Sequence, residues 1–360
     1  MTMDLAKPPP LEDLAERLWQ AVRRGDEQVA AATVRRALDE GADPEDVLLD
    51  VIASVQGRVG AEWAANRISV AQEHSATAIN DRAVALVALH PAARTEPVRG
   101  RIAVACVDGE WHGLPARLLA EVLRLRGWRV DYLGAQVPTH HLVAHIHRTG
   151  PDAVALSGSI ATRLPTAHAT ITACQATGTP VLVGGAAFGT DGRFARLLGA
   201  DAWAPDARTA ADDLARRPLP RPQPDHQPID DLPHLSDQEY TLVTRSRPQL
   251  VQAVFASLED AYPAMREYDE LQRERTAEDL SHIVEFLATA LYTDDEDLFR
   301  GFLVWTADVL AARGVPANSL LPALELLGRE LKDFPRAAGI LRSGSARLTR
   351  TLLTAAGTHQ

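Results

Sequence analysis

The sequence predicts a multidomain protein of the α and α/β classes: a helical bundle, a doubly wound parallel sheet and an all-α domain, in that order. Helix caps divide residues 10–92 into four segments. Buried strands alternate with helices over residues 99–217. A proline-rich linker at 218–235 then precedes a helical stretch at 236–358. A chain of 360 residues also exceeds what one hydrophobic core usually organises.

The first domain carries clear signals for the beginnings and ends of helices. Gly25 separates the first two segments, and Asp43 with Pro44 begins the third as an N-cap followed by a proline at the first helical position. Ser69 and Gln72 have the spacing of a capping box and begin the fourth segment. Four consecutive helices joined by short turns predict a four-helix bundle.

The turn between the third and fourth helices is short enough to bring Trp63 close to Glu73 and His74. Each residue also has an ordinary structural explanation. Trp63 suits the core of a bundle, and Glu73 is a favourable charge near a helix amino terminus. The three become candidate ligand contacts only together with the domain that follows them.

Four strands are predicted in the second domain, and each ends in small residues at the same edge of the sheet. Serines interrupt the third strand, and a glycine pair ends the fourth. Small residues let a large flat ligand approach the backbone, and doubly wound sheets bind ligands at the carboxyl ends of their strands. The strands span residues 101–107, 127–134, 153–159 and 180–185, with a helix at 115–126 after the first.

His112 follows the first strand and precedes its helix, so it projects from this carboxyl edge. Glu110, two residues earlier, is placed to accept a hydrogen bond from one ring nitrogen and to leave the other as a metal ligand. Without its neighbours, the pair would be read as an exposed polar loop.

The motifs Glu110-Trp-His112-Gly-Leu-Pro115, Ser157-Gly-Ser159 and Gly184-Gly185 resemble the cobalamin-binding domain, which has a Rossmann-like fold. The resemblance implies that His112 is the lower axial cobalt ligand and that the nucleotide tail enters a slot lined by the serines and glycines. Glu110 stands where that family has aspartate, and Pro115 where it has glycine. The other cofactor contacts that we infer are Glu110, Trp111, Gly113, Val137, Pro138, Ser157, Ser159, Thr162, Gly184, Gly185 and Phe188.

Trp63, followed ten residues later by Glu73 and His74, resembles the cap of cobalamin-dependent photoreceptors that act as light-regulated repressors. The resemblance implies an adenosylcobalamin whose upper face meets these three residues and whose cobalt–carbon bond breaks in light. Ala64 stands where those repressors carry a histidine that captures cobalt after photolysis. Only ten residues precede the first helix, so we expect no DNA-binding module and no direct operator binding.

The composition limits the partners, the location and the activity that we expect. The formal net charge of -11 disfavours a phosphate-binding surface, so no nucleic-acid partner is expected. The only cysteines, Cys106 and Cys174, exclude a disulfide framework. We expect a cytoplasmic protein without a membrane partner, because no leader and no 18-residue apolar run is visible. No catalytic motif is recognisable, so we expect no enzyme.

The last domain reads as five or six helices, a number that suits a globin-like or bundle fold. Arg275, Asp279 and His282 are spaced to share one helix face, for which a solvated surface is the simple interpretation. Together with Trp305 they resemble the carboxy-terminal domain of photocobilins, which implies bound biliverdin. The domain has no cysteine, so the pigment would be held non-covalently. Haem on His282 is the alternative.

A bilin needs an apolar slot and cations for its two propionates. We infer that His282 lies beneath the pyrroles, and that Arg275 is among the candidate cations. The candidates for the aromatic walls are Phe286, Phe299, Phe302 and Trp305, and those for the propionates are Arg273, Arg275 and Arg300.

His141 and His145 have a metal-binding spacing on a predicted helix, beside His140 and His147. No acidic or thiol residue is near them in the sequence, so we interpret them as a polar helix face.

The residues together predict a light sensor that signals through a change of homo-oligomeric state or of affinity for a downstream signalling protein. Two alternatives stay open. One is a corrinoid carrier for methyl transfer, and the other is a cobalamin sensor whose last domain binds other proteins without any pigment.

Overall fold

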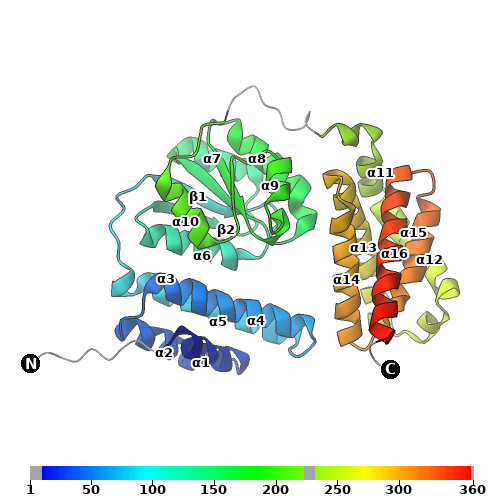
Figure 1. The fold of residues 1–360 in the computed structure, drawn as a ribbon, viewed down its shortest axis with the longest axis horizontal. Coiled ribbons are helices and arrows are strands. Elements are labelled where there is room, and N and C mark those ends of the chain that lie inside the picture. Colours follow the sequence, from blue (N-terminus) through cyan, green and yellow to red (C-terminus); the bar gives the residue numbers. More distant parts are fainter. Residues whose placement is uncertain (1–9, 223–231, 358–360) are drawn as a thin grey trace, which may run out of the picture. The chain divides into compact units, whose positions relative to one another are not determined.

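A computed structural model describes residues 10–222 and 232–357 of the chain (Figure 1). They form two compact units, residues 10–63 with 67–222, and residues 232–357. Half of the predicted linker, residues 223–231, lies outside the described residues. Its last part is structured, because the 3-10 turn η6 (Pro233–Asp237) begins directly after the buried Leu232.

The four predicted helices of the first domain are confirmed. The third consists of α3, η1 and α4, and it is continuous because η1 is a π-helical stretch rather than a break. Asp43 caps it by accepting from the amides of Glu45 and Asp46 at 2.8 and 3.2 Å. The cap, as we call this bundle, comprises α1 (Leu11–Arg23), α2 (Glu27–Asp39), α3 (Pro44–Asp46), η1 (Val47–Ile52), α4 (Ala53–Ala64) and α5 (Val70–Leu89).

A parallel sheet of order β2-β1-β3-β4-β5 follows within residues 100–222, which confirms the predicted doubly wound fold. Helices α6 and α10 cover one face, and α7 and α8 cover the other (Figure 1). The strands are β1 (Arg101–Cys106), β2 (Arg129–Gly134), β3 (Ala153–Ser157), β4 (Val181–Gly184) and β5 (Ala202–Ala204). The helices are α6 (Gly113–Leu125), α7 (Thr139–Thr149), α8 (Leu164–Gln175), α9 (Arg193–Leu197) and α10 (Ala207–Arg216).

The order of the strands reverses between β1 and β3, so the crevice for a ligand lies where these two strands end. Strand β5 was not predicted, because it has only three residues and too short an apolar run to stand out. The predicted start of the first helix of this domain is two residues late, since α6 begins directly after His112.

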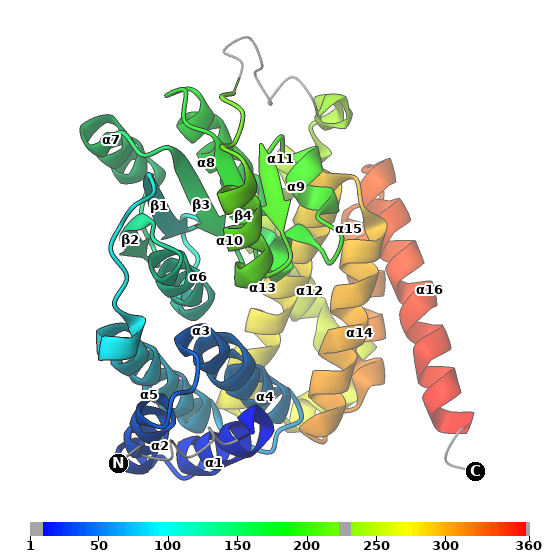
Figure 2. The same ribbon diagram turned by 60° about the vertical axis from the view of Figure 1, so that its left-hand side comes forward.

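The cap packs on the α6 side of the sheet, with α1 and α2 on the far side of α5 (Figure 2). Helix α5 runs beside α6 in the same direction. Val87 near its end lines a cavity together with Leu125, the last residue of α6. The hydroxyl of Tyr132 donates to the carbonyl of Gly113 at the start of α6 (3.2 Å). Seventeen residues of α5 precede Val87 and only twelve of α6 precede Leu125, so the first turn of α5 extends beyond the start of α6, toward the edge that carries His112.

The second unit is all-α, as predicted, and its helices share one apolar core around Leu287, Phe299 and Leu341. Its globin-like character stays a prediction. None of the described helices is long and apolar enough to cross a membrane. After η6 the unit comprises α11 (Glu239–Arg245), α12 (Arg247–Ala261), η7 (Pro263–Glu267), α13 (Glu270–Thr293), α14 (Glu296–Ala312), η8 (Ala317–Ser319), α15 (Leu320–Glu330) and α16 (Pro335–Gly357).

One carboxylate of the cap holds the α/β domain. Glu45 of α3 accepts from Nε and Nη2 of Arg126, which follows α6, at 2.6 and 2.8 Å. Arg208 of α10 donates to the same carboxylate at 3.3 Å and to Asp50 at 3.0 Å. The side chain of Glu45 is only 13% exposed, so water screens this pair less than a surface ion pair.

The substitution Glu45→Gln is expected to lower the free energy of unfolding by about 1–3 kcal/mol at pH 7, the usual size for a hydrogen bond to a charged group. The hydrogen bonds from Arg126 lower the pKa of Glu45 below its usual 4.5. The stabilisation is therefore complete above pH 4.5 and is lost as the pH falls below that value.

Urea unfolding at several pH values measures this effect. The difference between the wild type and Glu45→Gln should shrink steadily below pH 4.5. Glu40→Gln is the matched control, because Glu40 pairs with Arg36 on the exposed surface of α2 and is expected to change stability by less than about 0.5 kcal/mol. Equal stability of the wild type and Glu45→Gln at pH 7 would contradict this role.

Candidate functional site

Glu110 lies in the loop after β1, and its side chain is completely buried. One carboxylate oxygen accepts from the backbone amide of His112 (2.9 Å) and from its Nδ1 (2.6 Å). The other accepts from the amides of Ser159 and Ile160 in the loop after β3, at 2.7 and 3.0 Å. Burial alone would raise the pKa of Glu110, but these four hydrogen bonds lower it to about 2, so the carboxylate is ionised at neutral pH.

His112 is held with one ring nitrogen inward and the other outward. Because Nδ1 faces an ionised carboxylate, it carries a proton, and Nε2 keeps its lone pair. The side chain is 46% exposed, so the ring lies at the surface of this edge of the sheet. The arrangement matches the predicted one, in which a carboxylate orients an imidazole that can ligate a metal.

In this structure, Nε2 of His112 accepts a hydrogen bond from Trp111. Its indole N–H donates to Nε2 at 3.2 Å, and the two ring centroids lie 5.4 Å apart. The indole is 56% exposed. A metal can reach Nε2 only if this indole moves aside, so Trp111 competes with a metal for the imidazole.

A third loop joins the same edge through Asp108. Its carboxylate accepts from the backbone amide of Thr139 at 3.1 Å, and the Thr139 hydroxyl lies 2.8 Å from that of Thr170 in α8. The loops after β1, β2 and β3 are thus connected by side chains of the β1 loop. Val137 and Pro138, which directly precede α7, are half-buried there, as is Thr162 in η3 (Ala161–Arg163).

The small residues at the ends of β3 and β4 are required by the protein itself. A Cβ on Gly185, whose φ is +97°, would lie 2.3 Å from the carbonyl oxygen of Gly158. One on Gly184 would lie 3.1 Å from the carbonyl oxygen of Ala204. Close approach between neighbouring strands therefore accounts for both glycines without a ligand. Ser157 is also buried, and its carbonyl accepts from the amide of Val107.

Phe188 was predicted to contact the cofactor, and this expectation needs correction. Its side chain has no exposed surface and packs against Gly158, where a Cβ would lie 3.2 Å from its ring. It belongs to the core beneath the edge of the sheet. The phenylalanine supports the loop that follows β4 rather than offering a surface to a ligand.

The cap residues lie on adjoining helices. Trp63 is near the end of α4 and is partly buried against the core of the first unit. Glu73 and His74 are in the first turns of α5, with His74 Nδ1 3.6 Å from the Glu73 carboxylate. His74 is 77% exposed and Glu73 only 27%, so the histidine is the group that faces outward.

A chain of hydrogen bonds that was not predicted from the sequence ends on Glu73. Asn80 donates to Gln56, Gln56 donates to the hydroxyl of Thr77, and Thr77 donates to Glu73, each at 2.8 Å. Asn80 is completely buried between the helices. Polar residues at positions 73, 77 and 80, which share a helix face, were the available signal.

His145 has an acidic partner, contrary to our expectation for the histidines of α7. Its Nε2 lies 2.9 Å from the carboxylate of Asp131 on β2. Strand pairing brings Arg101 to the same carboxylate at 3.3 Å. Among the described residues, no group of three metal-ligating side chains gathers, so the interpretation as a polar face stands.

In the second unit, His282 of α13 is 60% exposed and lies 3.6 Å from the Glu285 carboxylate, whose hydrogen bond raises the pKa of His282. Arg275 is exposed and pairs with Glu278 at 2.6 Å. Trp305 of α14 is 48% exposed.

The phenylalanines that were predicted to line a bilin slot pack in the core of the unit. Phe286 and Phe302 stack with ring centroids 3.8 Å apart, and Phe299 is completely buried. These three rings fill the core of the second unit instead of lining a slot. His282 and Trp305 each lie one turn from the stacked pair on neighbouring antiparallel helices, so they sit at about the same level.

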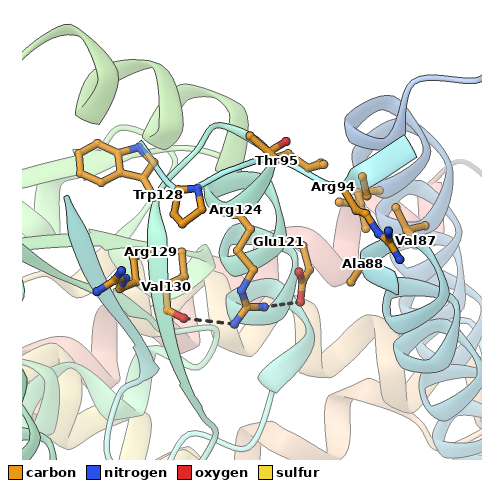
Figure 3. Close-up of a pocket in the computed structure, with 13 residues that line it drawn as sticks. Val87, Ala88, Arg94, Thr95, Glu121, Arg124, Trp128, Arg129 and Val130 are labelled. Carbon is orange, nitrogen blue, oxygen red and sulfur yellow. Dashed lines mark hydrogen bonds and ion pairs between the residues drawn. The ribbon is translucent and has the colours of Figure 1, made fainter. Parts of the chain in front are cut away.

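A cavity of about 340 Å³ lies at the opposite edge of the sheet, where β2 begins (Figure 3). Arg124, its central cation, donates to Glu121 at 2.6 Å and to the carbonyl of Val130 at 3.3 Å. Arg94 and Arg129 lie on opposite sides of it. Its charges are paired or spread apart, so this cavity is a weaker candidate than the edge at His112.

A buried carboxylate behind an exposed imidazole, at the switch point of a doubly wound sheet and beside a helical cap, defines a cobalamin-binding module. Imidazole suits a first-row transition metal, and the donor set therefore fits cobalt. Comparison with known families agrees. Residues 100–215 match the family described as B12 binding domain, and residues 14–87 match a second B12 binding domain family. The protein is a cobalamin-binding protein.

Relatives of two kinds match the chain. The chain is 34% identical over 193 residues to the HTH-type transcriptional repressor CarA of Myxococcus xanthus, which covers 49% of this chain and 59% of CarA. It is 25% identical over 209 residues to the corrinoid protein DSY3155 of Desulfitobacterium hafniense, which covers 55% of this chain and 94% of that protein. The chain thus spans little more than half the length of the repressor.

Among solved structures, the monomethylamine corrinoid protein of Methanosarcina barkeri has a TM-score of 0.50 and 19% identity. The match covers 57% of this chain and 99% of that protein. At this identity, the likeness concerns the fold alone, and it supports the arrangement of a helical cap followed by a doubly wound domain.

The substitution Trp111→Phe removes the indole donor that competes for Nε2 of His112 and keeps an aromatic ring. We expect cobalamin to associate severalfold faster and to bind up to about tenfold more tightly, the equivalent of one neutral hydrogen bond. Stopped-flow absorbance measures the rate. Trp128→Phe, beside the opposite cavity, is the control and should leave it unchanged. Equal rates for the wild type and Trp111→Phe would show that the indole does not compete.

Proposed function

We propose that the protein is a light-responsive sensor that binds adenosylcobalamin between the cap and the edge of the sheet. His112 would hold the cobalt through Nε2, and Trp63, Glu73 and His74 would contact the cofactor from the cap. The observation that carries the proposal is the course of α5. Val87 lies beside Leu125 near the ends of the two helices, and Glu73, fourteen residues before Val87, is about 3 Å beyond the level of Gly113, which is twelve residues before Leu125. The beginning of α5 therefore reaches the edge of the sheet that carries His112.

The upper ligand supplies the response to light. Bound adenosylcobalamin would supply a cobalt–carbon bond that light can break, with loss of the adenosyl group. Residues of the cap convert this loss into a structural change. Glu73, held through Thr77 and Gln56, and Trp63, at the end of the neighbouring helix, lose the group against which they pack. The cap then changes its position, and with it the oligomeric state or the affinity for a signalling partner.

The cap residues favour a sensor over a methyl carrier. A carrier must expose cobalt to a partner enzyme, whereas Trp63 near the end of α4 and the Glu73–His74 pair near the start of α5 would cover it. The match to DSY3155 over 94% of that protein is the observation that favours the carrier. Turnover of methylcobalamin with a methyl acceptor, together with indifference to light, would decide for it. Both thiols of the chain are buried and unpaired, which fits a cytoplasmic sensor.

The light response is tested with the full chain loaded with adenosylcobalamin. Spectra and the mass by size exclusion are recorded in darkness and after green light. We expect the corrin bands to shift and the mass to change. His112→Ala should move the long-wavelength corrin band to shorter wavelength in darkness, because the lower axial ligand is lost. His141→Ala, on the exposed side of α7, is the control. Identical spectra and masses in both conditions would refute the sensor.

The second unit is proposed to bind biliverdin non-covalently, near His282 and Trp305. The supporting observation is that these two exposed side chains lie at the same level of neighbouring helices. Cations are within reach on the same face, because Arg275 lies two turns before His282.

Titration with biliverdin tests this assignment. A red-region band should form that denaturation removes, since residues 232–357 contain no cysteine. His282→Ala should weaken binding about tenfold, and His234→Ala, in η6, should not. A haem spectrum instead would reassign the ligand, and binding of neither pigment would leave this unit as a protein-interaction domain.

A further inference from the structure

Arg163 is a cation at the edge of the sheet that carries His112, which we call the cofactor edge. It takes part in none of the interactions described above. It is the last residue of η3, the turn that follows β3. Its guanidinium lies against Gly109, where a Cβ would be 3.4 Å from Nη1, 3.5 Å from Cζ and 3.7 Å from Nε. Gly109 has a φ of +78°, and its missing side chain makes room for the arginine. Arg163 therefore lies directly beside the loop that carries Glu110 and His112.

This guanidinium has no partner among the residues that the structure describes. Its Nε is buried and makes no hydrogen bond. The two carboxylates of the adjacent loop are engaged elsewhere, since Glu110 holds His112 and the loop after β3, while Asp108 holds Thr139. A half-buried charge without a counter-ion is costly, and proteins retain one where a ligand completes it.

We propose that Arg163 binds the phosphodiester of the cobalamin nucleotide tail. The corrin side chains are neutral amides, whereas the phosphodiester carries a fixed negative charge at neutral pH. Arginine presents a planar set of donors that matches phosphate oxygens. An unpaired guanidinium beside the His112 loop is thus complementary to the one anionic group of this cofactor. The inference rests on cobalamin binding and adds to it the residue that selects a corrinoid with a nucleotide tail.

A purely structural role makes a different prediction. If Arg163 only packs against Gly109 to hold the loop, its loss disturbs His112 and weakens every corrinoid to the same extent. If it binds the phosphodiester, only corrinoids that carry the nucleotide tail are affected. Cobinamide lacks the tail and its phosphodiester but keeps the corrin ring and the cobalt, so it separates the two roles.

The experiment compares adenosylcobalamin with adenosylcobinamide, measured as dissociation constants on the full chain in darkness. Arg163→Gln is expected to weaken adenosylcobalamin about tenfold, the effect of losing one charge-assisted hydrogen bond, and adenosylcobinamide by no more than about twofold. Arg163→Lys should retain part of the preference, because it keeps the charge but not the planar donors. Raising the salt concentration should reduce the preference in the wild type and not in Arg163→Gln.

Arg216→Gln is the matched control, since Arg216 is exposed on α10 and pairs with Asp213. It should bind both corrinoids like the wild type. Unfolding midpoints of the cofactor-free variants show whether each one folds. Equal weakening of both corrinoids by Arg163→Gln, or no weakening of either, overturns the assignment. Failure of the wild type to bind either corrinoid would instead remove cobalamin binding itself, which is a separate result.

Discussion

The cofactor edge depends on one buried carboxylate. Glu110 has no exposed surface, and its burial is tolerated because four N–H groups from two loops converge on it. Those loops follow β1 and β3, the strands between which the order of the sheet reverses. The same contact therefore closes the switch point, fixes the tautomer of His112 and turns Nε2 outward. Geometry and chemistry at this edge are consequences of a single ion, and neither can change without the other.

A second constraint concerns the cap, because the two ends of α5 have different neighbours. Near its end, Val87 lies beside Leu125, and close to it Glu45 holds Arg126 and thereby the α/β domain. Its beginning carries Glu73 instead. The two ends are fourteen residues apart, about 21 Å along the helix. A small rotation about the held end would therefore displace the ligand-facing end most. Such a lever fits the proposed response to the loss of an adenosyl group.

Periodicity and capping residues predicted the domain order, the four helices of the cap and four strands, because these features depend on local sequence. Features that depend on tertiary structure could not be predicted from the sequence. Strand β5 is only three residues long, and η1 widens a helix without any capping signal. The motif at Gly185 predicts a ligand contact, yet the carbonyl of Gly158, directly after the neighbouring strand β3, leaves no space for a side chain there. The Glu110–His112 pair could be predicted, since it is local. The partners at Ser159 and Ile160 could not, because strand pairing alone brings them there.

Both thiols of the chain are shielded. Burial raises the pKa of the Cys106 thiol to about 12, with a smaller contribution from the negative charge of Glu110. Burial also raises the pKa of the Cys174 thiol to about 12. At neutral pH each is a protonated, inaccessible thiol, and such thiols react slowly with alkylating reagents. A cysteine introduced at an exposed position of the cap would therefore be labelled selectively in the otherwise natural chain. The protein is thus already suited to carry a single fluorescent or spin probe that reports the position of the cap.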